Sequence, residues 1–194
     1  MHTHATFDEL ALARQAQRDP DAFDALYRRY VTQVYRYCYA RVNNVADAED
    51  LTAQVFLAAL EALAKFEGRG AFAAWLFGIA SRKCADFYRR KYADRSTPLE
   101  VADTRADPEA ADPEQVALEQ SLLACVRRML RYISPDRVEA LHLRYWGGLS
   151  IHEMSVLMQR SESAVKMLIS RALNDLRERC LYERPESDPA HVVP

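Results

Sequence analysis

Glycine is scarce in this chain, which has only five glycines among 194 residues. Alanine, leucine and arginine, which all favour helices, are frequent instead. No stretch alternates polar and apolar residues with the period of two that a strand requires. The sequence therefore predicts an all-α fold.

Long hydrophobic runs are missing too. Runs such as Val55 to Leu60 are far shorter than the roughly 20 residues needed to span a bilayer. The first residues, Met1 to His4, have neither the basic start nor the apolar centre of an export signal. With 49% hydrophobic and 28% charged residues, the composition is that of a soluble globular protein. We expect a cytoplasmic protein without membrane insertion.

Clusters of cysteine and histidine are absent as well. The four cysteines are far apart in the sequence, at Cys38, Cys84, Cys125 and Cys180. They suggest neither a zinc site nor a disulfide framework, and we expect no metal and no cofactor. His142 and His152 could act as bases with Glu139 or Glu153, but no nucleophile or phosphate-binding loop accompanies them. We expect no catalytic residues and no enzymatic activity.

The net charge of −2 conceals an uneven distribution. Residues 82–95 contain six basic and two acidic side chains, whereas residues 94–114 contain seven acidic and two basic ones. A nearly neutral chain can still bind nucleic acid through a local basic face. The acidic stretch is rich in proline, aspartate and alanine without helical periodicity, which predicts a flexible linker over residues 93–112.

Helix starts are marked by capping signals. Thr6 with Glu9, and Ser150 with Glu153, have the spacing of capping boxes. Other caps precede a proline or acidic residues, at Asp19, Asn44, Asp112, Ser134 and Ser161. The expected helices span about 7–18, 20–41, 45–64, 71–92, 113–132, 135–146, 150–158 and 161–181. They form two small helical domains, at 6–92 and 113–181, before a disordered tail at 182–194.

The last two helices have the pattern of a helix-turn-helix. The longer one directs apolar residues to one face, at Val165, Leu168, Ala172, Leu173 and Leu176. Small polar and basic side chains lie on the opposite face, at Ser163, Lys166, Met167, Ser170 and Arg171. Such a helix suits the major groove of DNA. On periodicity alone, an ordinary helical hairpin with a solvated charged face explains the pattern equally well.

The helix after Asn44 is more apolar than one small domain requires. Leu51 and Val55 supply an inward stripe, while Phe56, Leu57 and Leu60 place apolar groups on further faces. An apolar excess beside acids suggests a protein partner. The alternative is a central helix covered on all sides by its neighbours.

Between residues 65 and 91, aromatic and basic side chains alternate. Phe72, Trp75 and Phe77 are followed by a run of arginines and lysines. Single-stranded DNA binding needs flat partners for unstacked bases and positive charge for the backbone. Phe72 and Phe77 are also good core residues, and Trp75 fits either role.

Two sets of motifs resemble regions of known proteins. The stretches from Asp47 to Leu51 (Asp-Ala-Glu-Asp-Leu) and from Phe72 to Leu76 (Phe-Ala-Ala-Trp-Leu) resemble the second region of bacterial sigma factors. The stretches from Leu143 to Ser150 (Leu-Arg-Tyr-Trp-Gly-Gly-Leu-Ser) and from Ser161 to Arg177 resemble the fourth region. The two regions with only a short linker between them resemble the extracytoplasmic-function (ECF) group.

This resemblance implies a sigma factor that binds core RNA polymerase and directs promoter-specific initiation. It implies polymerase docking by Asp47, Glu49, Asp50, Leu51, Gln54, Phe56 and Leu57. It implies recognition and opening of the −10 element by Lys65, Phe66, Arg69, Phe72, Trp75, Ser81, Arg82, Lys83, Arg89 and Arg90. It implies duplex recognition of the −35 element by Arg160, Ser161, Ser163, Lys166, Met167, Ser170 and Arg171. An anti-sigma factor is a further implied partner.

The chain departs from the family pattern at several positions. Ser81-Arg82 stands where the family often has Arg-Asn, so base preference cannot be transferred. Gln54 replaces an acid, Leu168 replaces an arginine, and Gln159 replaces the turn glycine. The competing interpretation is a two-domain DNA-binding regulator that never contacts polymerase; it leaves the 65–75 aromatics and the apolar excess unexplained.

Overall fold

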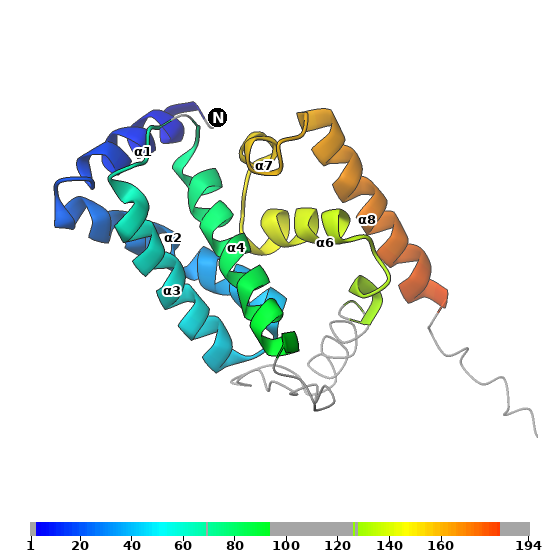
Figure 1. Cartoon of the computed structure of the whole chain (residues 1–194). Coiled ribbons are helices and arrows are strands. Elements are labelled where there is room, and N and C mark those ends of the chain that lie inside the picture. Colours follow the sequence, from blue (N-terminus) through cyan, green and yellow to red (C-terminus); the bar gives the residue numbers. More distant parts are fainter. Residues whose placement is uncertain (1–2, 69, 94–125, 127, 183–194) are drawn as a thin grey trace, which may run out of the picture.

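The computed structural model describes residues 3–68, 70–93, 126 and 128–182 (Figure 1). Its elements are α1 (Thr3–Gln15), α2 (Pro20–Val42), α3 (Val45–Leu63), α4 (Phe72–Ala93), α6 (Pro135–Leu141), the π-helical turn η1 (His142–Trp146), α7 (Ile151–Met158) and α8 (Glu162–Tyr182). The described part of the chain contains helices and no strand, so the predicted all-α class is confirmed. None of these helices is long and apolar enough to cross a membrane.

Several predictions fall outside the described residues. These are the helix at 113–132 up to residue 125, nearly all of the 93–112 linker, Asp112, Cys125, Arg69 and the tail from residue 183. Most of the other predicted helices match the structure closely, but the helix predicted over 7–18 is α1 at Thr3–Gln15. The helix expected over 135–146 is an α-helix only as far as Leu141 and continues as the π-helical turn.

The predicted caps show why most boundaries were accurate. Ser150 and Glu153 form both bonds of a capping box, and Asn44 Oδ1 accepts from the Asp47 amide at 3.0 Å. Asp19 caps α2 ahead of Pro20. The capping box expected at Thr6 is wrong, because α1 already begins at Thr3 and Thr6 lies inside it. Ser134 precedes α6 without a side-chain cap bond.

The first part of the chain is a bundle of α1–α4 (blue to green in Figure 1). Its central helix is α2, which contacts α1, α3, α4 and η1. The largest buried side chains of this bundle are Leu26, Val34, Tyr37, Leu51, Leu63, Phe72, Leu76 and Phe77. These burials show that much of the aromatic content of residues 66–77 belongs to the core.

The second part consists of α6, η1, α7 and α8 (yellow to orange in Figure 1). The wide turn of η1 closes with the Gly147 amide donating to the His142 carbonyl at 2.9 Å. A Cβ at Gly147 would lie 2.8 Å from both the Leu143 carbonyl oxygen and Phe77 Cε1. Only glycine fits there, and the close approach brings this turn against α4 of the first part.

The two parts are packed together. A single hydrophobic cluster contains core residues of α2, α3 and α4 and also Leu143, Leu149, Met154 and Val165 of the second part. A smaller cluster of Ile133, Leu141 and Ala172 holds α6 against α8. The division of the sequence into two domains gave no indication of this shared core.

Candidate polymerase and nucleic-acid interfaces

Helix α3 exposes a narrower apolar surface than the sequence suggested. Leu51 is fully buried and Phe56 is 5% exposed, with its ring edge-on to Tyr27 at 4.7 Å between centroids. Neither side chain can reach a partner in this structure, so their assignment as contact residues is corrected to core residues. The most accessible large apolar side chains of α3 are Leu57 and Leu60, which are 59% and 51% exposed; Val45, at the start of the helix, is 43% exposed.

Acidic side chains flank that apolar pair. Glu49 and Asp50 are exposed, and Asp50 accepts a hydrogen bond from Gln54 Nε2 at 2.6 Å. Asp47 is half-buried and pairs with Lys91 Nζ of α4 at 3.5 Å. The outer face of α3 therefore offers two leucines beside carboxylates, and Leu60 was missing from the predicted contact set.

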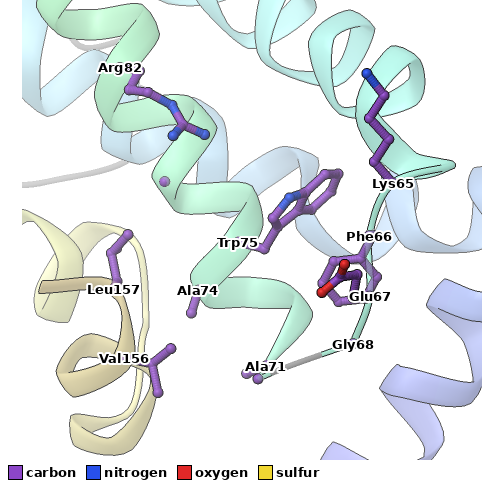
Figure 2. Close-up of a pocket in the computed structure, with 12 residues that line it drawn as sticks. Lys65, Phe66, Glu67, Gly68, Ala71, Ala74, Trp75, Arg82, Val156 and Leu157 are labelled. Carbon is purple, nitrogen blue, oxygen red and sulfur yellow. The ribbon is translucent and has the colours of Figure 1, made fainter. Parts of the chain in front are cut away.

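Three aromatic rings meet at the junction of the 64–71 loop and α4. Phe66 and Phe72 are 8% and 1% exposed, and each ring lies within 5.4 Å of the Trp75 ring, centroid to centroid. Figure 2 shows two of these rings, Trp75 on α4 and Phe66 on the preceding loop, lying next to each other. Phe66 and Phe72 are thus core residues in place of the predicted DNA contacts, while Trp75 is only half-buried.

Trp75 borders a pocket of about 350 Å³. Lys65 and Glu67 approach it from the loop side, and Arg82 projects from the next turns of α4 (Figure 2). Val156 and Leu157 of α7 form the opposite wall, although they come from the other part of the chain. The pocket combines a flat ring, two cations and apolar walls.

Most of the predicted cations of this region face solvent. Lys65, Arg82, Arg89 and Arg90 are exposed, and Arg89 pairs with Asp86 on its own helix. Lys83 and Ser81 are half-buried. Ser81 differs from the rest, because its hydroxyl is engaged by a side chain of α6.

Helix α8 presents its predicted polar face to solvent. Ser161, Ser163, Lys166, Met167, Ser170 and Arg171 are all exposed. Ser161 Oγ accepts from the Ala164 amide at 3.2 Å and so caps the helix. On the other face Val165 and Ala172 are fully buried, but Leu173 is 42% exposed, contrary to the predicted inward stripe.

The turn between α7 and α8 is formed without the glycine that is usual in the family. Gln159 has a φ of +52°, the left-handed conformation that glycine usually supplies at this place. Arg160, in the same turn, forms an ion pair with Asp136 of α6. The turn is therefore made with a strained glutamine and fixed by a contact within the second part.

The histidines do not form the arrangement that an acid–base site needs. His142 is 5% exposed, and neither ring nitrogen has a hydrogen-bond partner among the described residues. Burial lowers its pKa to about 3, with Arg41 adding to the effect. His152 lies on the surface with Nδ1 3.1 Å from Glu162 Oε1. Neither ring contacts the carboxylates considered from the sequence.

Glu139 makes contacts that the sequence did not predict. It was considered only as a partner for histidine, yet its carboxylate bonds to Tyr37, Arg41 and Ser81 of the first part. The Tyr37 hydroxyl, fully buried, has a raised pKa because of burial and the nearby Glu139. No local pattern signals contacts between residues 58 to 102 positions apart.

Comparisons with known proteins identify two family regions in the chain. Residues 26–93 match the family described as Sigma-70 region 2, and residues 123–176 match Sigma-70, region 4. The chain is 36% identical over 170 residues to the ECF RNA polymerase sigma factor BldN of Streptomyces coelicolor. That alignment covers 86% of this chain but 64% of the relative, so the chain spans somewhat less than two thirds of its length.

A second relative is covered more fully. The chain is 35% identical over 150 residues to the ECF RNA polymerase sigma factor SigD of Mycobacterium bovis, covering 75% of this chain and 70% of the relative. Among solved structures, CnrH in complex with the cytosolic domain of CnrY has a TM-score of 0.67, covering 90% of this chain and 98% of that one. At 24% identity, this last likeness shows a shared fold.

Proposed function

The chain belongs to the ECF group of RNA polymerase sigma factors. On this basis we propose that it directs promoter-specific transcription initiation, and we assign one step of initiation to each of three surfaces. The family is not a catalytic one. The sigma factor supplies recognition, and core RNA polymerase supplies the chemistry. We propose that the chain acts in the cytoplasm, where polymerase meets promoter DNA.

Docking to core polymerase is assigned to the outer face of α3. Leu57 and Leu60 form an exposed apolar pair beside Glu49 and Asp50. Exposed apolar groups ringed by charge are typical of a protein contact. Leu51 and Phe56 serve this surface indirectly, because their burial fixes the rotation of α3 about its axis.

Recognition and opening of the −10 element are assigned to the pocket beside Trp75. A base that leaves the duplex loses its stacking, and the Trp75 ring offers a replacement surface. Lys65 and Arg82 at the pocket, with Arg89 and Arg90 further along α4, can follow the DNA backbone. The half-buried tryptophan among exposed cations is the observation that carries this assignment.

Reading of the −35 element is assigned to the first turns of α8. Lys166, Ser170 and Arg171 are exposed on one face, while Val165 on the other is buried in the shared core. The capped N-terminus adds amide groups that favour phosphate. An anti-sigma factor is a further proposed partner, on the strength of family membership.

The rival proposal, a DNA-binding regulator that never contacts polymerase, is tested by binding without DNA. Purified chain is titrated against core RNA polymerase in the absence of promoter. We expect a stable complex, weakened by replacing Leu57 and Leu60. A chain that binds DNA but shows no affinity for core polymerase would favour the regulator.

A further inference from the structure

The turn between α1 and α2 is tied to the loop that forms one wall of the Trp75 pocket. Gln17, in this turn, donates through Nε2 to the Leu63 carbonyl at 3.1 Å and to the Phe66 carbonyl at 2.8 Å. Both acceptors are carbonyls, so the side chain must present its NH₂ group, which has one hydrogen for each of them. The half-buried Gln17 amide therefore fixes the main chain of residues 63–66 from outside the loop.

One of these acceptors is the last carbonyl of a helix. Leu63 ends α3, and its carbonyl also accepts from the Phe66 amide at 2.9 Å. Carbonyls in the last turn of a helix have no partner within the helix, and Gln17 supplies one from another element. The path of the chain as it leaves α3 is thus set by a residue 46 positions earlier.

Phe66 connects Gln17 to the pocket. Its carbonyl accepts from Gln17, while its ring lies 5.1 Å from the Trp75 ring, centroid to centroid. Figure 2 shows the Phe66 ring beside that of Trp75, with Lys65 and Glu67 next to it on the same loop. A shift of the loop main chain would therefore move both the ring that supports Trp75 and the charges beside it.

The loop borders a second hollow, on the side of α1. This hollow has a volume of about 680 Å³, with Gln17 on one side and Phe66 and Glu67 on the other. Phe66 and Glu67 also line the Trp75 pocket. Because hollows lie on both sides of these two residues, the loop gains less support from packing than a core segment does. Hydrogen bonds such as those of Gln17 therefore matter more for its position.

We propose that Gln17 is a positioning residue for the −10 site. Its amide fixes the main chain of residues 63–66, and through the Phe66 ring it keeps Trp75 in place to receive an unstacked base. This role rests on the proposed function of the pocket. It extends that function to a residue before the match to Sigma-70 region 2, which begins at residue 26. A loop that is already in place need not be ordered when the base arrives, so opening is faster.

A double-mutant cycle tests whether Gln17 acts through Trp75. Gln17→Met keeps the length of the side chain and removes both donors. We expect it to slow promoter opening, read by permanganate reactivity, by roughly tenfold, as the loss of two hydrogen bonds would do. Closed-complex formation should be kept. In a Trp75→Ala background the same replacement should have no further effect. Losses that multiply in the double variant would show that Gln17 acts elsewhere and would overturn the proposal.

Gln15→Met is the matched control for this cycle. The Gln15 amide lies on the exposed side of the same segment and donates to Asp19 Oδ2 at 2.8 Å. We expect this variant to open promoters as fast as the wild type. An equal loss in Gln15→Met and Gln17→Met would contradict a specific role for the Gln17 bonds.

Tryptophan fluorescence tests the placement of the ring without polymerase or DNA. Trp75 and Trp146 are the two tryptophans of the chain, so Trp146→Phe leaves Trp75 as the single reporter. In that background we expect Gln17→Met to increase the quenching of Trp75 by acrylamide, because the loop no longer holds Phe66 against the ring. Gln15→Met should leave the quenching unchanged. Equal quenching in the Gln17→Met variant and its parent would contradict the positioning role.

The outcomes separate the positioning role from the proposed function. Thermal melting first checks folding. If Gln17→Met does not fold, Gln17→Asn replaces it in both tests, because its amide is one methylene shorter and cannot reach both carbonyls. If Trp75→Ala slows promoter opening but the folded Gln17 variant does not, only the positioning role fails. If Trp75→Ala itself opens promoters normally, the proposed function of the pocket fails, and the role of Gln17 at the −10 site fails with it.

Discussion

The Trp75 side chain packs against the core on one side and borders a pocket on the other. Its ring packs on Phe66 and Phe72, yet it also lines the pocket beside Arg82. The sequence predicted aromatic rings among cations but could not separate buried rings from exposed ones. Burial depends on which helix covers each ring, and here Phe72 lies beneath Tyr30 of α2.

Replacing Trp75 by alanine should separate the steps of initiation. Closed-complex formation should be largely kept, because the proposed duplex contacts lie on α8. Strand opening should fall by roughly tenfold or more, since stacking on an aromatic ring is worth about 1–3 kcal/mol per base. Permanganate reactivity of promoter thymines measures strand opening. Thermal melting is the control, and a folded variant that opens promoters normally would show that Trp75 is only structural.

Glu9 gives the chain a pH-dependent stability. Burial raises its pKa to about 7 from 4.5, with Arg29 of α2 opposing and Glu153 of α7 adding to the rise. The folded chain thus keeps a proton that the unfolded chain releases, so stability falls as pH rises from 4.5 to 7.

Glu9→Gln should remove this loss of stability at higher pH. Urea unfolding should show the variant more stable than the wild type at pH 8, by about 2–3 kcal/mol, and nearly equal at pH 4.5. Glu178→Gln, at an exposed position of α8, is the control. A stability difference that is the same at both pH values would mean that Glu9 is not protonated in the folded chain.

At the scale of the helix, α3 has a buried core face and an exposed face that we propose docks to polymerase. Replacing Leu57 and Leu60 by alanine should weaken core-polymerase binding by about 2 kcal/mol or more, roughly 30-fold, with little effect on folding. Phe56→Ala should instead destabilise the fold by about 3–5 kcal/mol. Titration against core polymerase and thermal melting measure the two effects, with exposed Tyr145→Ala as control. Unchanged affinity in the double leucine variant would remove α3 from the interface.

On α8 the two cations are expected to differ. Arg171→Ala should weaken binding uniformly over sequences and lower the salt slope by about 1, as a phosphate contact does. Lys166→Ala should relax specificity at one base position at a cost of about 1–3 kcal/mol. Footprinting at several salt concentrations measures both, with exposed Arg177→Ala as control. An unchanged upstream footprint in the double variant would refute the placement.

Helix boundaries were largely predictable because caps are local. Asn44, Ser150 and Ser161 each bond to an amide three residues away, a signal carried within one turn. The π-helical turn was not predictable, because it depends on Gly147 meeting Phe77 from the other part of the chain. Leu173 was predicted to be buried but is exposed, because periodicity assigns a residue to a face of the helix and does not show whether another element covers that position.

For the whole molecule, the sequence predicted the class, the two regions and their order, and the comparisons confirm them. It did not predict that the regions share a core. Apolar stripes on α4 and α7 show that each helix is covered, but not which helix covers it. The hydrogen bonds of Glu139 to Tyr37 and Ser81 join residues 58 to 102 positions apart, beyond the reach of any local pattern.

Run-off transcription with purified core RNA polymerase and a genomic promoter library tests the central claim most directly. With the chain added, we expect new transcripts whose upstream DNA shares two separated motifs, one near −35 and one near −10. Permanganate reactivity of thymines in the −10 motif should fall when Trp75 is replaced by alanine. The footprint over the −35 motif should change when Lys166 and Arg171 are replaced by alanine. A transcript set identical with and without the chain, across the whole library, would contradict the account.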